Sequence, residues 1–422
     1  MSPWLSIVVP VHNVAGYLPA CIDSILERDR DGIELVLVDD CSTDESGAIC
    51  DRYSGSSPDV RVIHLSTNQG VAQARNHGLA AARGDYVLFV DGDDYLVSGW
   101  LARLKQEMDR LGPIDLVICR YGSESKVLSN AAMFPCEAAG RKLDAAVVLQ
   151  HLTAIDFYLD HCWPYLISRA LIERHGVRFK RFMVAEDAEF IVRILTLASS
   201  AAYSDDELYC YRERDGSLKN HKGAAPTASF LLAADAMRQT MENVAATRVQ
   251  REFAASQIRH SLGVFAARLC LLDDAEAASI STMVGPEQLP PDMRRSCSRG
   301  VAETLIAYRD SVDAATLTLA SPAKRKPVFI YCAGPSAEAV IRVLCGAQYD
   351  VRAVIDDNAA FNGRTLRDVP IADASYLQTL SASERAQAFI VVCTQKLTAS
   401  RRIIASLEAR GFAPAQIAHR RF

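Results

Sequence analysis

The stretch Tyr86-Val87-Leu88-Phe89-Val90-Asp91-Gly92-Asp93-Asp94 joins an apolar run directly to three carboxylates. The run predicts a buried β-strand, and the acidic residues follow at its carboxyl end. Open α/β sheets bind ligands beyond the carboxyl ends of their strands, and Mg²⁺ or Mn²⁺ takes oxygen ligands, commonly one or two carboxylates plus substrate phosphates. We therefore expect a divalent metal and a phosphorylated ligand to meet here. Asp-Gly-Asp-Asp is equally good turn chemistry, so the neighbouring elements must decide.

Strand and helix signals alternate three more times before this stretch. The predicted strands, each with the helical pattern that follows it, are Leu5–Val9 with 17–26, Leu35–Val38 with 42–53, and Val60–Ile63 with 70–82. The second helix is expected to begin at a capping box formed by Ser42 and Glu45. Four such repeats in about a hundred residues predict an α/β fold with a parallel, doubly wound sheet.

Polar residues follow each of these strands. Pro10-Val11-His12-Asn13 ends the first strand, Asp39-Asp40 ends the second, and Asn68-Gln69-Gly70 comes after the third. Taken singly, each group is most simply a turn or a helix cap. Because the carboxyl ends of parallel strands lie at one edge of a sheet, the groups together predict a ligand cleft at that edge.

Composition sets the outer bounds. A chain of 422 residues with 50% hydrophobic content can form two or three domains, and its formal net charge of -5 gives no support to nucleic-acid binding. We find neither an apolar run of the roughly 20 residues that a membrane span needs nor a basic secretion signal. The 12 cysteines lack the spacing of zinc or disulfide sites and are expected to be reduced and mostly buried.

Five segments, in order, carry a resemblance to a known family. They are I-V-V-P-V-H-N from residue 7, L-V-D-D-C-S-T-D from 37, N-Q-G-V-A-Q-A-R-N-H-G from 68, G-D-Y-V-L-F-V-D-G-D-D from 84 and A-E-D-A-E-F from 185. This order resembles the family-2 inverting glycosyltransferases, which have a nucleotide-diphospho-sugar-binding GT-A fold. The resemblance covers about residues 4 to 220. His12 departs from it, because the family usually has Tyr there to stack on the base.

The resemblance implies a UDP-sugar donor site. Asp40 would accept a hydrogen bond from the uracil imide, Arg75 would reach the nucleotide or diphosphate, and Asp91 and Asp93 would hold the ribose and a Mn²⁺ or Mg²⁺ ion. The alternative for Arg75 is a surface ion pair, and Asp94 could simply cap the helix before Trp100. The implied donor-binding residues are Pro10, Val11, His12, Asn13, Asp40, Asn68, Arg75, Asp91, Gly92 and Arg212.

The acidic pair Glu186-Asp187 precedes a helical pattern over 190–195. Local sequence alone favours helix capping for both. The resemblance instead makes Asp187 the general base that takes the proton of the acceptor hydroxyl, with Glu186 supporting the site.

Residues 161–165 resemble the aromatic segment on the acceptor side of the family's site. There Trp163 and Tyr165 would contact the acceptor, although Trp163 could equally belong to the core. Arg212 could bind diphosphate as a lid closes, and Arg214 is the less favoured choice for this role. His221 is a candidate third metal ligand, for which an exposed, unliganded histidine is the commoner outcome.

The expected organisation is a GT-A catalytic domain over 1–222, a helical region over 223–320 and a second α/β domain over 325–422, with residues 321–327 as a linker. The last domain is Rossmann-like and loosely resembles the nucleotide- or sugar-binding module of some bacterial sugar acyltransferases. It has only one glycine of the G-x-G-x-x-G pattern, at Gly334, and its Asp356-Asp357 pair could contact a ribose or form a turn. A docking role is an equal alternative.

The resulting hypothesis is an inverting, metal-assisted hexosyl- or N-acetylhexosaminyltransferase that acts on a glycan, polysaccharide or lipid-linked acceptor. We expect a cytoplasmic protein, with the inner face of the membrane, peripheral membrane association and homo-oligomerisation left open. One alternative is a non-catalytic nucleotide-sugar-binding or assembly subunit. A sugar nucleotidyltransferase is disfavoured, because Pro10-Val11-His12-Asn13 stands where that class has a glycine-rich phosphate loop.

Overall fold

The chain forms two compact units in a computed structural model. One unit comprises Met1–Leu218 with Met237–Ala255, and the other comprises Lys219–Ala236 with Ser256–Phe422. The structure describes residues 2–26, 32–124, 140–212, 222–295, 297–324, 326–332, 335–358, 361–394 and 397–420. No helix among these residues is long and apolar enough to cross a membrane.

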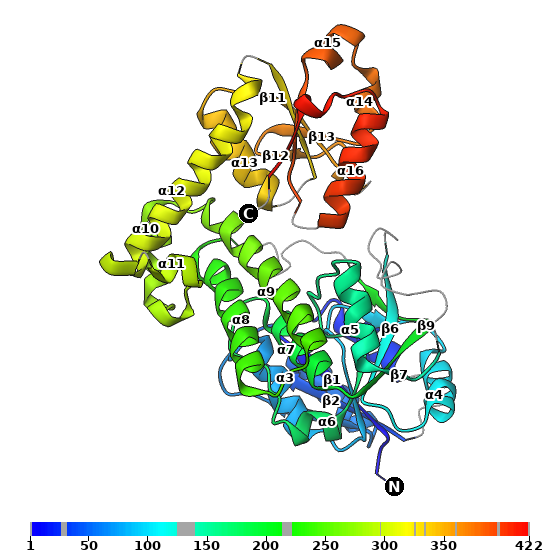
Figure 1. The fold of residues 1–422 in the computed structure, drawn as a ribbon. Helices are drawn as coiled ribbons and strands as arrows, with labels where there is room; N and C mark the ends of the chain where they lie inside the picture. The colour runs from blue at the N-terminus through cyan, green and yellow to red at the C-terminus, as the bar shows by residue number, and fades with distance from the viewer. Residues whose placement is uncertain are drawn as a thin grey trace. The chain divides into compact units, whose positions relative to one another are not determined.

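The first unit is built on a nine-stranded sheet whose main path runs β3-β2-β1-β4-β8-β6-β9-β5, with β7 paired to β9 (Figure 1). Its first four strands are parallel to one another, as predicted. Every residue of β1 and β2 is buried, which is typical of a parallel sheet covered on both faces. The strands are β1 (Leu5–Val11), β2 (Ile33–Asp39), β3 (Val60–His64), β4 (Tyr86–Phe89), β5 (Tyr95–Leu96), β6 (Leu116–Ser123), β7 (Leu143–Asp144), β8 (Tyr165–Ser168) and β9 (Ser200–Tyr211).

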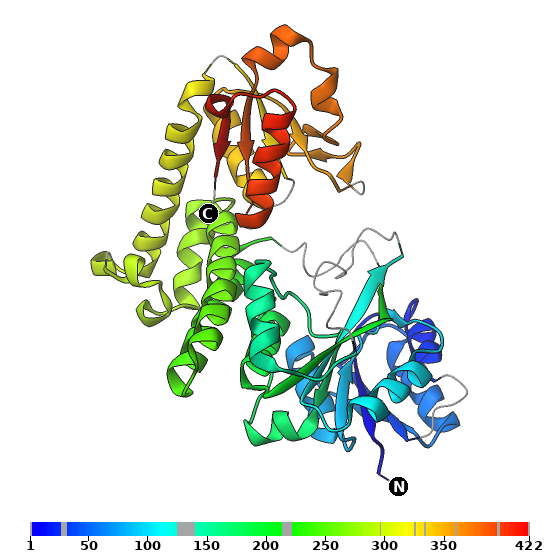
Figure 2. The ribbon, with the colours of Figure 1, turned by 45° about the vertical axis from the view of Figure 1, so that its right-hand side comes forward.

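The far half of this sheet is mixed, which the sequence analysis did not predict. β8 runs antiparallel to both β4 and β6, while the long strands β6 and β9 pair in parallel (Figure 2). β5, which directly follows the acidic stretch, pairs with the end of β9. The end of β9 is therefore brought back beside Asp91-Gly92-Asp93-Asp94.

Seven helices of this unit are α1 (Leu18–Ile25), α2 (Ser46–Ser56), α3 (Val71–Ala81), α4 (Trp100–Leu111), α5 (Ala145–Ala154), α6 (Arg169–Arg174) and α7 (Glu186–Leu197). The predicted capping box at Ser42 and Glu45 is wrong. Helix α2 begins at Ser46, and Glu45 makes no side-chain cap bond. The backbone N–H of Ser42 donates to Asp39 and its hydroxyl accepts from the backbone N–H of Asn13, so Ser42 serves the loop after β2 instead.

The second unit contains a six-stranded sheet of order β12-β13-β11-β10-β14-β15, in which only β12 is antiparallel. This confirms the expected fold class, with a second, smaller α/β sheet. Its strands are β10 (Pro327–Tyr331), β11 (Asp350–Ile355), β12 (Thr365–Leu366), β13 (Val369–Ala372), β14 (Phe389–Val392) and β15 (Ile417–His419), and its helices are α13 (Pro335–Gly346), α14 (Tyr376–Thr379), α15 (Ala382–Gln387) and α16 (Leu397–Ala409).

Helices precede this second sheet in the chain, as the spacing after residue 224 predicts. They are α8 (Ala224–Asn243), α9 (Arg248–Leu269), α10 (Asp274–Ser279), α11 (Pro291–Arg295) and α12 (Val301–Ala320). The linker predicted over 321–327 is wrong for its first three residues. A short 3₁₀ helix, Ser321–Ala323, continues directly from α12, and Ala323 is fully buried in the core beneath β10.

Helix α3 packs so closely on the sheet that one of its residues must be glycine. A Cβ on Gly78 would lie 2.2 Å from Cγ1 of the buried Val8 and 3.3 Å from Cγ2 of Val38. Both valines are in the interior and have little room to move. This close approach positions α3, and with it the turn that precedes the helix.

We expect Gly78→Ala to lower the free energy of unfolding by roughly 1–3 kcal/mol, because the added methyl group overpacks the contact with Val8. Gly55→Ala, in helix α2 with no atom within 4 Å of the added Cβ, is the matched control. It should be neutral or stabilising by up to about 1 kcal/mol. Thermal unfolding of both variants measures the difference, and equal midpoints would contradict the packing argument.

Candidate functional site

A buried arginine joins two acidic segments that are far apart in the sequence. Arg75, on α3, is only 3% exposed. One of its terminal nitrogens donates to Oδ1 of Asp91 at 2.8 Å and the other donates to Oε1 of Glu186 at 2.9 Å. Its guanidinium carbon also lies 5.4 Å from the centre of the Phe179 ring. Arg75 therefore fixes the loop after β4 against the first turn of α7.

The three acids of the β4 loop occupy different environments. The side chain of Asp91 is 27% exposed and Asp93 is half-buried, whereas Asp94 is buried. Asp94 accepts hydrogen bonds from the Tyr209 hydroxyl and, at 2.7 Å, from the backbone N–H of Arg212. Burial raises the pKa of Asp94 to about 8, and the neighbouring Asp91 and Asp93 add to the shift.

Asp94 therefore anchors the end of β9. It does not cap α4, since that helix begins after Gly99 without a side-chain cap. Tyr209 is a site residue that the sequence analysis missed. Its hydroxyl also accepts from the backbone N–H of Asp91 at 3.2 Å. Only the pairing of β9 with β5 brings it there, and no local pattern predicts that contact.

Asp91 and Asp93 are the two carboxylates of this loop that could hold a metal. Mg²⁺ and Mn²⁺ sites commonly use one or two carboxylates, with substrate phosphates and water completing the shell. Within the described part of the chain, no group of three or more His, Cys, Asp and Glu residues could hold a metal ion. The residues thus fit an ion shared with a diphosphate, and do not fit a closed site made by protein ligands alone.

The loops after β1 and β2 meet at His12. Its Nδ1 lies 2.9 Å from the carbonyl oxygen of Asp40, and its Nε2 lies 3.0 Å from the amide nitrogen of Asn68. The carboxylate of Asp40 accepts from the backbone N–H groups of Gln69 and Gly70, each at 2.7 Å. Asp40 thus holds the 68–70 turn, which the sequence analysis did not foresee.

Four more of the predicted donor-binding residues surround this junction, namely Asn13, Pro10, Val11 and Gly92. Asn13 accepts from the backbone N–H of Thr43 at 2.8 Å, while Pro10 and Val11 lie buried within β1. A Cβ on Gly92 would lie 3.1 Å from the Pro10 carbonyl oxygen, so the β4 loop passes close to the end of β1. The structure therefore gathers the predicted donor-binding residues at one edge of the sheet.

Glu186 and Asp187 occupy the first turn of α7, after Ala185 in a left-handed conformation at φ 64°. Glu186 is buried against Arg75, whereas Asp187 is half-buried and accepts from the backbone N–H of Ala188 at 2.8 Å. Burial raises the pKa of Asp187 well above its usual range, Glu186 adds to the shift, and Arg75 opposes it. A carboxylate with a raised pKa is a stronger proton acceptor once ionised.

The predicted acceptor-side aromatics are buried. Trp163 is 6% exposed and is stacked between His161 and Tyr209, with ring centres 4.1 Å apart on each side. Tyr165 is fully buried within β8. Both faces of the Trp163 ring are covered, and Tyr165 is fully buried. Neither residue therefore presents a ring face to a ligand.

Arg212 lies beside the acidic loop, with its guanidinium carbon 5.2 Å from the ring centres of both Tyr17 and Tyr95. Its Nε lies 3.3 Å from a carboxylate oxygen of Glu124. Arg214 and His221 lie outside the described residues. Among the described residues, the structure thus leaves Arg212 as the basic side chain predicted after β9.

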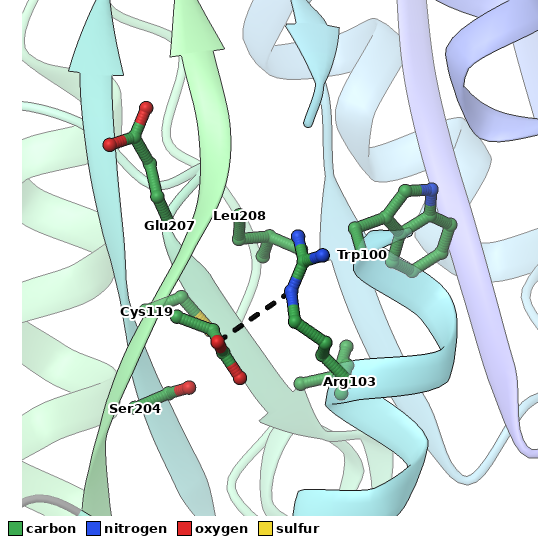
Figure 3. A pocket seen from close by; sticks show the side chains of 8 residues that line it. Trp100, Arg103, Cys119, Ser204, Glu207 and Leu208 are labelled. Carbon is green, nitrogen blue, oxygen red and sulfur yellow. Dashed lines mark ion pairs between the residues drawn. The ribbon is translucent and has the colours of Figure 1, made fainter. Parts of the chain in front are cut away.

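The pocket in Figure 3 is a different feature. It lies where α4 meets β6 and β9, and Arg103 points toward Asp206, with 3.6 Å between Nε and Oδ1. It is lined by Trp100, Arg103, Leu104, Cys119, Ser204, Asp206, Glu207 and Leu208. None of these is a predicted site residue, so we assign the pocket no part in the chemistry.

Comparisons with known proteins bear on the family and the fold of this chain. A family model described as glycosyl transferase family 2 matches residues 6–154. The chain is 36% identical over 221 residues to the uncharacterized glycosyltransferase EpsJ of Bacillus subtilis and 32% identical over 222 residues to the glycosyltransferase GlyG of Streptococcus pneumoniae. Each match covers 52% of this chain, and they span 63% of EpsJ and 73% of GlyG.

Among solved structures, residues 1–349 of S. aureus TarS in complex with UDP-GlcNAc superimpose with a TM-score of 0.53. The match covers 75% of this chain and 92% of that one at 20% identity. At this level of identity the likeness concerns the fold alone.

We expect Arg75→Ala to destabilise the first unit by about 3–5 kcal/mol, because it leaves Asp91 and Glu186 without the cation that compensates their burial. Arg178→Ala, which removes a partly exposed pair with Glu173, should cost about 1 kcal/mol or less. Urea unfolding of the full chain compares the two variants. Similar losses would contradict a central role for Arg75.

Proposed function

The chain belongs to glycosyl transferase family 2, and we propose that it transfers a sugar from a UDP-sugar to a hydroxyl group of a glycan, polysaccharide or lipid-linked acceptor, with inversion at the anomeric carbon. The observation that carries this proposal is the double ion pair of Arg75. It holds Asp91, at the expected donor side, against the turn that presents Asp187. The complex of TarS with UDP-GlcNAc supports a uridine diphosphate donor.

The donor is bound at the edge where β1, β2 and β4 end. Asp40 uses a remaining lone pair to accept from the uracil imide while it holds the 68–70 turn. His12, fixed by Asp40 and Asn68, packs its imidazole ring against the base in place of the tyrosine ring that the family usually has. Asp91 and Asp93 would hold Mn²⁺ or Mg²⁺, which when bound neutralises charge on the departing diphosphate.

Asp187 acts as the base. It takes the proton of the acceptor hydroxyl as the oxygen forms a bond to the anomeric carbon, and the bond from that carbon to the diphosphate oxygen breaks on the opposite face. UDP leaves with the bonding electrons, and the configuration is inverted. Glu186 is a positioning residue here, since Arg75 holds its carboxylate.

Replacement of Asp187 distinguishes a catalytic glycosyltransferase from the alternative, a non-catalytic nucleotide-sugar-binding subunit. We expect Asp187→Asn to lower the rate of UDP release from a UDP-sugar by about 10²–10⁴-fold, because the base is lost. Calorimetry should show unchanged UDP binding, and Glu173→Gln is the control. In the wild type the rate should fall as pH drops through the raised pKa of Asp187, above the ordinary carboxyl range. Unchanged turnover in Asp187→Asn would remove it from this role.

The metal is tested by binding. Asp93→Asn should weaken Mn²⁺-dependent UDP binding by roughly tenfold or more, since loss of a supporting residue alone costs 10–100-fold at metal sites. Asp206→Asn, which changes an exposed acid outside the site, should leave it unchanged. Calorimetric titrations of UDP with and without Mn²⁺ measure both variants. If the wild type bound UDP equally well with and without Mn²⁺, the proposed role of the metal in donor binding would be ruled out.

A further inference from the structure

Asn76 follows Arg75 on α3 and binds the backbone of a residue that lies 103 positions further along the chain. Its Nδ2 donates to the carbonyl oxygen of Phe179 at 2.8 Å, and its Oδ1 accepts from the backbone N–H of Phe179 at 2.9 Å. One side chain thus satisfies both backbone polar groups of a single residue, which fixes that residue in position and in orientation. The sequence analysis gave Asn76 no role, because no local pattern connects it to Phe179.

The Phe179 ring belongs to a cluster of three buried rings. It stacks on Phe190, on α7, with ring centres 3.8 Å apart, and it meets Phe89, at the end of β4, edge to face at 5.1 Å. Phe89 and Phe190 also meet edge to face, at 5.8 Å, and each of the three residues is at most 3% exposed. The cluster therefore joins the strand that leads into the acidic loop to the helix that begins with Glu186 and Asp187.

Residues 178–179 are also fastened to α7 by a hydrogen bond. A terminal nitrogen of Arg193, on α7, donates to the carbonyl oxygen of Arg178 at 2.6 Å. Phe190 lies three residues after Asp187, so the two side chains share a face of the helix. Since a ring stack and a hydrogen bond both join this stretch to α7, the position of the stretch helps to set the position of the helix.

The donor side of the proposed site has supports of its own. Strand β4 pairs with β1 and β8, and Asp94 in the acidic loop accepts from the Tyr209 hydroxyl. Helix α7, by contrast, begins without a side-chain cap, after Ala185 in a left-handed conformation. Loss of the contacts of Phe179 should therefore displace Asp187 relative to the donor and leave the donor side in place.

We propose that Asn76 and Phe179 are positioning residues for the transfer reaction, which together fix the distance and direction from Asp187 to the anomeric carbon of a bound donor. This inference rests on the proposed function. Asn76 holds the Phe179 backbone, and the Phe179 ring sets the spacing between β4 and α7. A misplacement of about 1 Å lowers the rate of an enzymatic reaction by as much as roughly 10²-fold. The effect falls on turnover, because neither residue has to touch UDP.

Two variants of the full chain test this role. Asn76→Ala removes both hydrogen bonds to the Phe179 backbone, whereas Phe179→Leu keeps them and removes the ring stack. UDP release from UDP-glucose, UDP-galactose and UDP-GlcNAc gives kcat, and calorimetric titration of UDP gives its affinity and the number of molecules that bind it. We expect kcat per UDP-binding molecule to fall by roughly tenfold to a hundredfold in both variants, with UDP affinity unchanged.

Asp144→Ala is the matched control, since it also removes a side-chain hydrogen bond to the backbone, at the start of α5 and outside the site. It should lower the midpoint of thermal unfolding without changing kcat per UDP-binding molecule. A purely structural role would reduce the number of molecules that bind UDP and leave the turnover of the others at the wild-type value.

That result would overturn the inference and leave the proposed function intact. A parallel loss of UDP affinity and kcat would also overturn it, because the donor side would then depend on the same two residues. If Asn76→Ala does not fold, Phe179→Leu decides between these outcomes alone. A wild type that releases UDP from none of the three donors would overturn both the inference and the proposed function.

Discussion

A guanidinium buried away from water is tolerated only when carboxylates compensate its charge, and the rest of this site depends on that condition. Arg75 satisfies it with Asp91 and Glu186, which come from a strand end and a helix start. Arg75 is the cation that both of these carboxylates contact. The positions of the β4 loop and of α7 are consequently set by charge neutralisation as well as by the apolar core.

Local sequence patterns predict well those structural features that depend on residues close together in the sequence. The run at Tyr86–Phe89 forms β4 with the predicted bounds, and the polar strand ends do gather at one edge. Predictions fail where a distant partner competes. Ser42 has the spacing of a helix cap, yet the loop after β2 uses both its N–H and its hydroxyl. Asp94 also resembles a helix cap in the sequence, but its carboxylate instead accepts a hydrogen bond from the hydroxyl of Tyr209, 115 residues away.

Aromatic residues show a second limit of sequence analysis. A tryptophan near a sugar site invites the expectation of ring stacking on a sugar face. Whether a face is available depends on what covers it, and here His161 and Tyr209 cover both. Only the three-dimensional arrangement shows which ring faces are covered.

The left-handed turn at Ala185 has an energetic meaning for the acid pair that follows it. An alanine at φ 64° costs about 1–2 kcal/mol relative to the ordinary helical region, so this turn does not form by its own preference. The ion pair of Glu186 holds it in place from outside. A glycine would relieve the strain, but it would also widen the range of backbone conformations open to the turn. Ala185 thus adopts a conformation that is unfavourable for alanine, and this conformation limits the directions in which the Asp187 side chain can point.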